Sequence, residues 1–245
     1  MNDTNGQVVA GGHGGGNRSD QLKNPINLLI DKETDSLIIC DRWNQRVVQW
    51  PRRSGTTQGE ILLDNIFCSG LAMDDQRYLY VSDTTKNEVR RYRIGDKNGT
   101  LVAGGDGTGD GLKQLNTPYY IFLDKQQSVY VSDNMNNRVI KWAKNAKEGI
   151  VVAGGQGAGN SMKQLSSPEG VFIDTSDNLY VADERNDRVM RWPKGATHGT
   201  VIAGGNGQGS GANQLNGVNG VFVDRHGNLY VADTDNNRVQ RFLID

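Results

Sequence analysis

The chain has 245 residues, and its 27 basic and 28 acidic side chains give a formal net charge of −1. This balance offers no general electrostatic attraction to nucleic acid or to an anionic membrane. No apolar run approaches the roughly 20 residues of a membrane-spanning helix, and the N-terminus resembles no signal peptide. We therefore expect a soluble, cytoplasmic protein without membrane contact. An extracellular location is the alternative if a signal peptide has been removed.

Glycine is frequent, at 32 residues, whereas charged residues make up an ordinary 22% of the chain. This combination is typical of many tight turns rather than of disorder. The chain has two cysteines, Cys40 and Cys68. We interpret them as two small buried apolar residues, which fits a reducing compartment.

Along the chain, short apolar strands that end on aspartate recur at a fixed spacing. The first strand of each repeat ends on Asp31, Asp74, Asp124, Asp174 and Asp224. The second strand ends on Asp41, Asp83, Asp133, Asp183 and Asp233, at spacings of 42, 50, 50 and 50 residues. Composition alone cannot produce such a period, so the sequence predicts five structural repeats.

The fourth repeat illustrates the strands that we expect in each unit. Its four strands are predicted at residues 170–174, 179–183, 188–192 and 200–203, separated by turns rich in Gly, Asn and Asp. The second repeat lacks a ten-residue glycine-rich loop that the later repeats share. Four-stranded antiparallel meanders at this period are typical of β-propeller blades.

The two ends of the chain carry complementary strands. Residues 7–10 match a fourth strand, and residues 238–242 match a third strand that has no fourth strand after it. We therefore predict one all-β domain over residues 1–245, a propeller of five blades closed by pairing of these two segments. The alternative is that the chain forms part of a six-bladed ring.

The repeat resembles the NHL repeat over essentially the whole chain. The resemblance rests on Asn178-Leu-Tyr-Val-Ala-Asp-Glu-Arg-Asn-Asp-Arg-Val189 and on the corresponding Asn228-Leu-Tyr-Val-Ala-Asp-Thr-Asp-Asn-Asn-Arg-Val239. It implies a propeller, usually of six blades, but no single activity. Such propellers serve as RNA-binding or protein-binding domains of ubiquitin ligases, as extracellular sensor domains of bacterial kinases, and as amidating lyases.

Residues that recur in nearly every repeat are interpreted as framework. The second-strand aspartates are expected to accept N–H groups of the following turn, with arginines five positions later reaching back across the same hairpin. One aromatic ring per repeat is expected to pack between blades, at Trp50, Tyr92, Trp142, Trp192 and Phe242. The glycine-rich runs precede no helix, so we interpret them as connections rather than phosphate-binding loops.

Positions that differ between repeats are the candidates for binding. In a meander, the turns after the second strand and the loops entering the first strand lie on one face. Candidates at these places are Trp43, Met135, Arg185, Tyr119, Tyr120, Glu169 and Asn219. Glu169 and Asn219 could also join a calcium or magnesium site at a channel mouth, but we predict no metal site there.

These observations favour a monomeric, non-enzymatic scaffold that recognises a protein or peptide through one loop face, without cofactor or catalytic residues. By the resemblance, this scaffold would be the substrate-recognition part of a larger protein such as a ubiquitin ligase. The first alternative is an RNA-binding domain. The second is a metal-dependent lyase or a lactonase-like enzyme, although the histidines His13, His198 and His226 lie in loops that do not converge.

Overall fold

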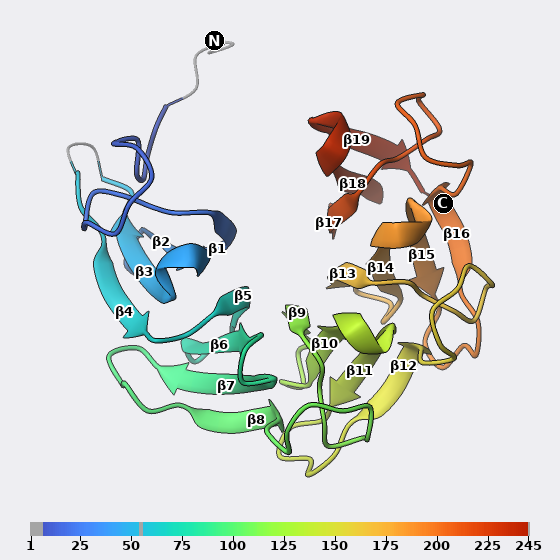
Figure 1. The fold of residues 1–245 in the computed structure, drawn as a ribbon, viewed down its shortest axis with the longest axis horizontal. Helices are drawn as coiled ribbons and strands as arrows, with labels where there is room; N and C mark the ends of the chain where they lie inside the picture. The colour runs from blue at the N-terminus through green and yellow to red at the C-terminus, as the bar shows by residue number, and fades with distance from the viewer. Residues whose placement is uncertain (1–6, 54–55, 245) are drawn as a thin grey trace.

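The computed structural model describes residues 7–53 and 56–244, and these residues form the five predicted blades (Figure 1). The first blade contains β1 (Pro25–Asp31), β2 (Ser36–Asp41), β3 (Arg46–Pro51) and β4 (Glu60–Asp64). The second contains β5 (Cys68–Met73), β6 (Tyr78–Asp83), β7 (Glu88–Arg93) and β8 (Thr100–Gly104). Each blade is an antiparallel sheet, and its first strand lies toward the centre of the ring.

The remaining blades follow the same order. The third contains β9 (Pro118–Leu123), β10 (Val129–Asp133), β11 (Arg138–Trp142) and β12 (Ile150–Gly154). The fourth contains β13 (Pro168–Ile173), β14 (Leu179–Asp183), β15 (Arg188–Trp192) and β16 (Thr200–Gly204). The fifth contains three strands, β17 (Val218–Val223), β18 (Asn228–Asp233) and β19 (Arg238–Leu243). One-turn 3₁₀ helices follow the second strand of four blades: η1 (Arg42–Asn44), η2 (Asn134–Asn136), η3 (Glu184–Asn186) and η4 (Thr234–Asn236).

The second strand of each inner blade is the core of the fold. In β10 and β14 every residue is buried, the polar Ser132, Asp133 and Asp183 included, so burial does not alternate along these strands. Both faces of such a strand are covered because neighbouring blades pack against each other face to face. The core is therefore a series of clusters between blades instead of a single centre.

The third-strand aromatics of the second to fifth blades pack between blades as predicted, whereas Trp50 packs within the first blade, beside Ala10 and Leu22. Trp142 and Trp192 are only 2% and 3% exposed. Before the fourth strand of each of these blades the chain passes directly over the ring, at Gly149 and Gly199. A Cβ atom at Gly199 would lie 2.8 Å from Trp192, so only glycine permits this approach.

The repeated aspartate and arginine tie each connecting loop to the next blade. Asp183 accepts hydrogen bonds from the Ser166 N–H at 2.6 Å and from Arg188 Nε at 2.7 Å. Arg188 then donates to the carbonyl oxygens of Asn160 and Gln164, at 2.7 and 3.1 Å. The same pair is formed by Asp41–Arg46, Asp133–Arg138 and Asp233–Arg238. The prediction of a framework role was right, but in these blades the aspartate binds the N–H of the incoming loop rather than that of the following turn.

The predicted closure of the ring is wrong. The fifth blade keeps three strands, and residues 7–10 pair with no strand. Ala10 and Leu22 instead pack against the first blade, beside Trp50. The Gly15–Leu22 bridge is formed in the same way as the Gln208–Leu215 bridge of a later connection, so this segment is the first blade's own connecting loop.

Figure 1 accordingly shows an opening between the first and fifth blades. Apolar side chains border it on both sides. Leu28 of β1 is 57% exposed, whereas its counterpart Val171 is 7% exposed, and Val239 of β19 is 70% exposed, whereas Val189 is fully buried. These two blade faces lack the neighbour that covers the same faces elsewhere.

The interpretation of the cysteines is corrected as well. Cys40 and Cys68 are both fully buried, but they form a disulfide with a Cα–Cα distance of 5.7 Å. They meet because β2 of the first blade packs against β5 of the second blade, a contact that sequence spacing does not reveal. The argument from the cysteines to a reducing compartment therefore loses its basis.

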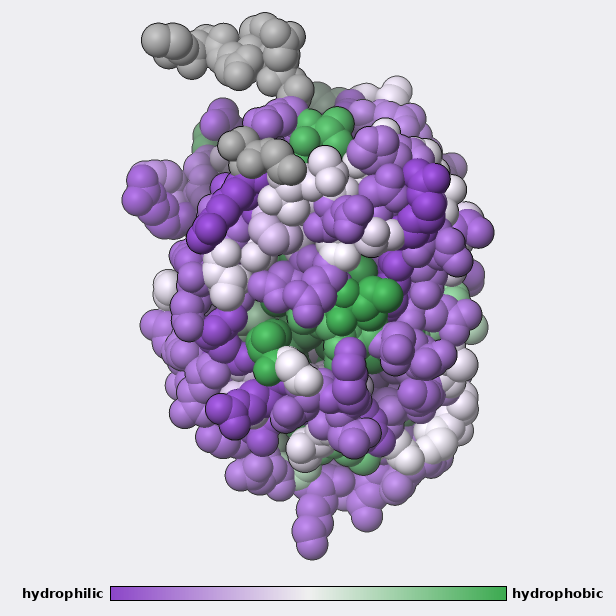
Figure 2. Space-filling view, turned by 90° about the vertical axis from the view of Figure 1, so that its left-hand side faces the viewer, coloured by the Kyte–Doolittle hydropathy of each residue, from purple (hydrophilic) through white to green (hydrophobic). Residues whose placement is uncertain are grey.

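No helix in the described part of the chain has the length and hydropathy needed to cross a membrane. The side of the molecule that carries the first blade is mainly hydrophilic, with hydrophobic groups gathered near its middle (Figure 2). Exposed apolar side chains of the N-terminal segment and β4 include Val8, Val9 and Ile61.

Candidate binding face and channel mouth

The one-turn helices form one face of the ring, on the side toward the viewer in Figure 1. Each turn ends on a residue with left-handed backbone, Gln45, Asn137, Asp187 or Asn237. Asn and Asp adopt this conformation more readily than most residues. The turns therefore share one backbone geometry, while the residue at the middle of each turn is free to vary.

Three of the predicted binding residues occupy these turn positions. Trp43 lies in η1 and is 59% exposed, and Met135 lies in η2 and is 56% exposed. Arg185 lies in η3, with an exposed side chain whose Nε is 3.9 Å from Glu184 Oε2. The face thus displays two large apolar groups and a cation on a rigid framework.

Three further predicted residues are joined by hydrogen bonds near the centre of the ring, where the first strands of the blades begin; we call this place the mouth. The hydroxyl of Tyr120 in β9 donates to Asn219 Oδ1 in β17, and Asn219 Nδ2 donates to Glu169 Oε2 in β13. The chain of contacts links the third, fourth and fifth blades. The Asn219 side chain is thus engaged by protein groups through both its oxygen and its nitrogen.

Tyr119 belongs to a second group at the mouth, centred on Arg42 of η1. The Arg42 guanidinium lies 4.6 Å from the ring centre of Phe67 and 5.1 Å from that of Tyr119. It also donates to Ser69 Oγ and, at 3.3 Å, to the Cys68 carbonyl. Cation–π contacts and hydrogen bonds together hold this charge in one place.

Two second-strand serines position the first strands that carry these residues. Ser82 Oγ accepts from the Gly70 N–H at 2.7 Å and donates to the Tyr119 carbonyl at 2.8 Å, so it joins neighbouring first strands. Ser132 Oγ donates to the carbonyl of Glu169 in the same way. At the position of these serines, the fourth and fifth blades have Ala182 and Ala232, which cannot form such hydrogen bonds.

The electrostatics of the mouth are divided between its two sides. Arg42 supplies a positive charge from the first blade, and Glu169 and Glu184 supply carboxyl groups from the fourth. Burial, together with the nearby Glu184 carboxylate, raises the pKa of Glu169 to about 7. The Glu169 carboxyl group therefore loses its proton as pH rises through neutrality, and the net charge of the mouth becomes more negative.

Sequence reasoning found the residues of the face but missed some that organise the mouth. Tyr120, Glu169 and Asn219 are brought together, Tyr119 lies beside Arg42, and Trp43, Met135 and Arg185 stand on separate turns. Arg42 was overlooked, although it follows Asp41 at a position where the other repeats have Thr84, Asn134, Glu184 and Thr234. Arg42 is the only basic residue at this repeat position, and this difference from the other repeats could have identified it as a candidate.

Among residues 7–53 and 56–244, no three His, Cys, Asp or Glu side chains are grouped so that they could hold a metal ion. His13 lies in the connecting loop before the first blade, near Asp20, and His226 lies in the turn between β17 and β18. Glu169 and Asn219 bind each other.

Known structures share this fold at low sequence identity. An auxiliary nutrient binding protein from Bacteroides thetaiotaomicron aligns with 90% of this chain and 59% of its own, at a TM-score of 0.71 and 19% identity. A gluconolactonase from Xanthomonas campestris aligns with 92% and 77%, at a TM-score of 0.64 and 16% identity. A virginiamycin B lyase from Staphylococcus aureus, in catalytically inactive form with quinupristin, aligns with 90% and 68%, at a TM-score of 0.61 and 11% identity.

These likenesses place the protein in the class of β-propellers, where binding proteins and enzymes share one fold. The family model of the NHL repeat matches residues 215–242, so the fifth blade is an NHL repeat, as the resemblance in sequence predicted. The chain spans about three fifths of the length of the nutrient binding protein. Among curated proteins, none matches the sequence.

Proposed function

We propose that this propeller is a non-enzymatic binding module whose face of one-turn helices recognises a protein or peptide. The observation that carries the proposal is the exposure of Trp43, at 59%, on a turn whose geometry does not require it. A polar residue would serve the turn equally well, as Thr85 and Asp235 do at the corresponding positions. Trp is strongly enriched among the residues that dominate binding energy at protein interfaces, so a Trp exposed without a role in its turn points to contact with a partner.

The composition of the face supports a protein ligand. Trp, Tyr and Arg are the residue types that contribute most to the binding energy of protein interfaces, and Met is enriched there. Trp43, Met135 and Arg185 occupy three different turns of the ring, and Tyr119 is half-buried at the mouth. A partner could place a side chain at the mouth while its main chain rests on the turns.

The charges of the mouth suit a polar or charged side chain of the partner. Arg42 is held on one side by Ser69 and two aromatic rings, and Glu169 lies on the other side with its amide partner Asn219. When Glu169 is ionised, these groups of opposite sign favour one orientation of a bound peptide and penalise others.

RNA binding is less well supported by this face. A nucleic-acid surface needs an excess of positive charge along the phosphate path. Here Arg42 and Arg185 are accompanied by Glu169, Glu184 and Asp235, so basic side chains do not predominate. An enzymatic role like that of the lactonase or lyase above would require catalytic groups at the mouth, where the arrangement offers Glu169 without a histidine or metal-ligand cluster beside it in the described residues.

The proposal can be tested by selecting random displayed peptides on the immobilised full chain. We expect enrichment of peptides that bind the wild-type protein but not a Trp43→Ala, Met135→Ala double variant. Parallel binding measurements with a mixed-sequence single-stranded RNA should show affinity that is weak and that falls steeply with salt. Tight RNA binding would contradict the proposal. So would selected peptides that bind the double variant as tightly as they bind wild type.

A further inference from the structure

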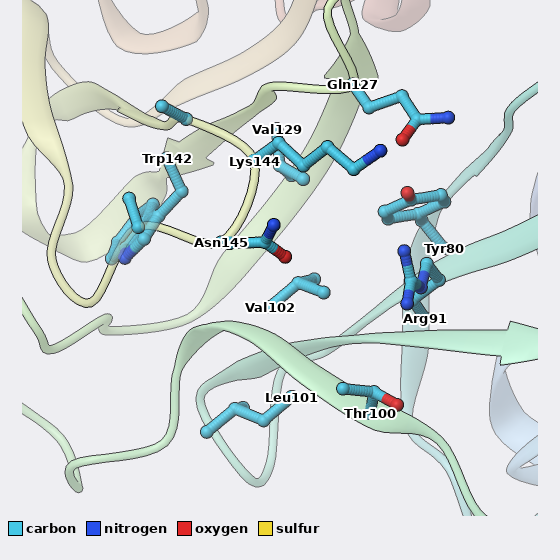
Figure 3. A pocket seen from close by; sticks show the side chains of 12 residues that line it. Tyr80, Arg91, Thr100, Leu101, Val102, Gln127, Val129, Trp142, Lys144 and Asn145 are labelled. Carbon is cyan, nitrogen blue, oxygen red and sulfur yellow. The ribbon is translucent and has the colours of Figure 1, made fainter.

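A cavity lies away from the binding face, between the second and third blades. It encloses about 260 Å³ and is lined by residues of β6 to β8 on one side and by Gln127 and the end of β11 on the other (Figure 3). Pockets that take drug-sized ligands usually measure about 300–1,000 Å³. This cavity therefore suits a small molecule.

The polar groups of the cavity are basic or neutral. Arg91 and Lys144 line it, and no carboxylate does. Among the described residues neither cation forms an ion pair with an acid, and Arg91 lies over the ring of Tyr78 at 4.7 Å. The cavity thus carries two positive charges that no lining group neutralises.

The corresponding cavity between the third and fourth blades differs in how its cations are paired. There Lys141 and Lys194 stand in place of Arg91 and Lys144, and both are neutralised. Lys141 Nζ is 3.0 Å from Asp124 Oδ2, and Lys194 Nζ is 2.8 Å from Asp177 Oδ2. Asp124 of that cavity has a counterpart in Asp74, which accepts from the Tyr80 hydroxyl at 3.2 Å and forms no ion pair with Arg91 in the described structure. In the cavity between the second and third blades, Gln127 occupies the place of Asp177, which removes the internal partner for Lys144.

Two atoms of this cavity are also buried without a hydrogen-bond partner in the described structure. They are Nε of Arg91, which can only donate, and Oε1 of Gln127, which can only accept. Buried polar groups in native proteins are nearly always satisfied, so unpaired ones at a cavity point to a missing partner. That partner must offer an acceptor to Arg91 and a donor to Gln127.

A non-polar wall completes the site. Val102 of β8, Val129 of β10 and Trp142 of β11 line the cavity opposite or beside the polar groups. A ligand therefore needs a short carbon body as well as its polar ends. A small hydroxy acid has all three features, because its carboxylate accepts from Arg91, its hydroxyl donates to Gln127, and its carbon chain contacts the wall.

We propose that the cavity between the second and third blades binds a small organic anion that carries a carboxylate and at least one hydroxyl group. The site is separate from the face of one-turn helices and does not depend on the function proposed for that face. Its positive charges come from the second blade and from the turn after β11, so the ligand bridges two blades.

Calorimetric titration of the full chain with D-glycerate, at constant ionic strength, tests the proposal. We expect saturable binding with a dissociation constant in the millimolar range or tighter. Glycerol lacks the carboxylate and propionate lacks the hydroxyl, so each should bind at least tenfold more weakly. Absence of saturable D-glycerate binding, or equal binding of either analogue or of inorganic sulfate, would overturn it.

Variants locate the site. Gln127→Asp introduces the carboxylate that the neighbouring cavity already has at Asp177, so the fold should tolerate it while D-glycerate binding falls at least tenfold. Gln126→Asp adds the same charge at an exposed position outside this cavity and should change the affinity less than twofold. If the two variants bind D-glycerate alike, the ligand does not occupy this cavity.

Discussion

At the scale of single residues, the repeated side chains and the exceptions to the repeat have different roles. Asp183 and Arg188 are buried and bonded to the incoming loop. In the second blade, which has no such loop, Asp83 accepts from the N–H groups of Thr85 and Lys86 in its own turn, and Glu88 replaces the arginine. The second blade can therefore have Glu88 in place of the repeated arginine, because it has no incoming loop for an arginine to bind.

Removal of the arginine should therefore be costly. We expect Arg188→Ala to lower the free energy of unfolding by about 3–5 kcal/mol, because it leaves Asp183 buried without its charge partner. Arg185→Ala, in the same blade but exposed, should change stability by less than about 0.5 kcal/mol. Denaturant titration of both variants measures the difference, and equal stabilities would show that the buried pair is not a structural link.

Glu169 gives a second prediction, through pH. Its pKa is about 7 in the folded protein and near 4.5 in the unfolded chain, so the folded state keeps a proton that the unfolded state releases between these values. Stability should fall as pH rises through this window, by about 1–3 kcal/mol in total. Glu169→Gln cannot ionise, so it should be more stable than wild type at pH 8 and similar to it at pH 5. Denaturation at both pH values measures this, and the same difference at each would contradict the pKa assignment.

Residues could be predicted from the sequence where the repeat marked them, either by recurrence or by a change at a known position. Trp43 and Glu169 were found because they differ from the residues at the same position in the other repeats. Ser82 and Ser132 were missed because a small polar residue in a buried strand gives no sign of which neighbouring strand it will bind. Arg42 was missed because its aromatic partners come from two other blades.

At the scale of elements, the strands followed the local pattern closely. The strands predicted at residues 179–183 and 188–192 coincide with β14 and β15. β13 begins at Pro168, before the predicted 170. Short runs of β-branched and aromatic residues between turn residues define such strands, whereas the partner of an end strand depends on the geometry of the whole ring.

The third-strand aromatics lead to a prediction at this scale. Trp142 is 2% exposed and joins the core between the second and third blades, so Trp142→Ala should reduce stability by about 3–5 kcal/mol. Trp43→Ala removes an exposed ring and should leave the melting temperature nearly unchanged. Thermal unfolding monitored by circular dichroism compares the two, and a large loss for Trp43→Ala would place that residue in the framework.

At the scale of the whole molecule, the ring behaves as a row of blades in which each one is stabilised by its neighbours. The inner blades have a neighbour on both sides. The fifth blade has three strands and leaves Val239 70% exposed. The sequence could not predict this opening, because the match between residues 7–10 and a fourth strand does not show which blade the segment will join.

The fifth blade should consequently open more often than the inner blades. We expect backbone amides of β19 to exchange hydrogen for deuterium faster than those of β15, the corresponding strand of the fourth blade. Mass spectrometry of peptides that cover the two strands measures the rates. Equal protection would mean that the end blade is as well supported as the inner ones.

The central claim for the whole molecule is that the face of one-turn helices is a binding surface. It is tested most directly by the affinity of a display-selected peptide for wild type, Trp43→Ala and Tyr119→Ala. Each variant should weaken binding at least tenfold, or by about 1.4 kcal/mol, and Trp43→Ala should do so without loss of stability. Ile150→Ala is the control, since Ile150 is 60% exposed but lies on the outer strand β12, and it should leave the affinity unchanged. Unchanged affinity in Trp43→Ala and Tyr119→Ala, or equal losses in all three variants, would contradict the claim.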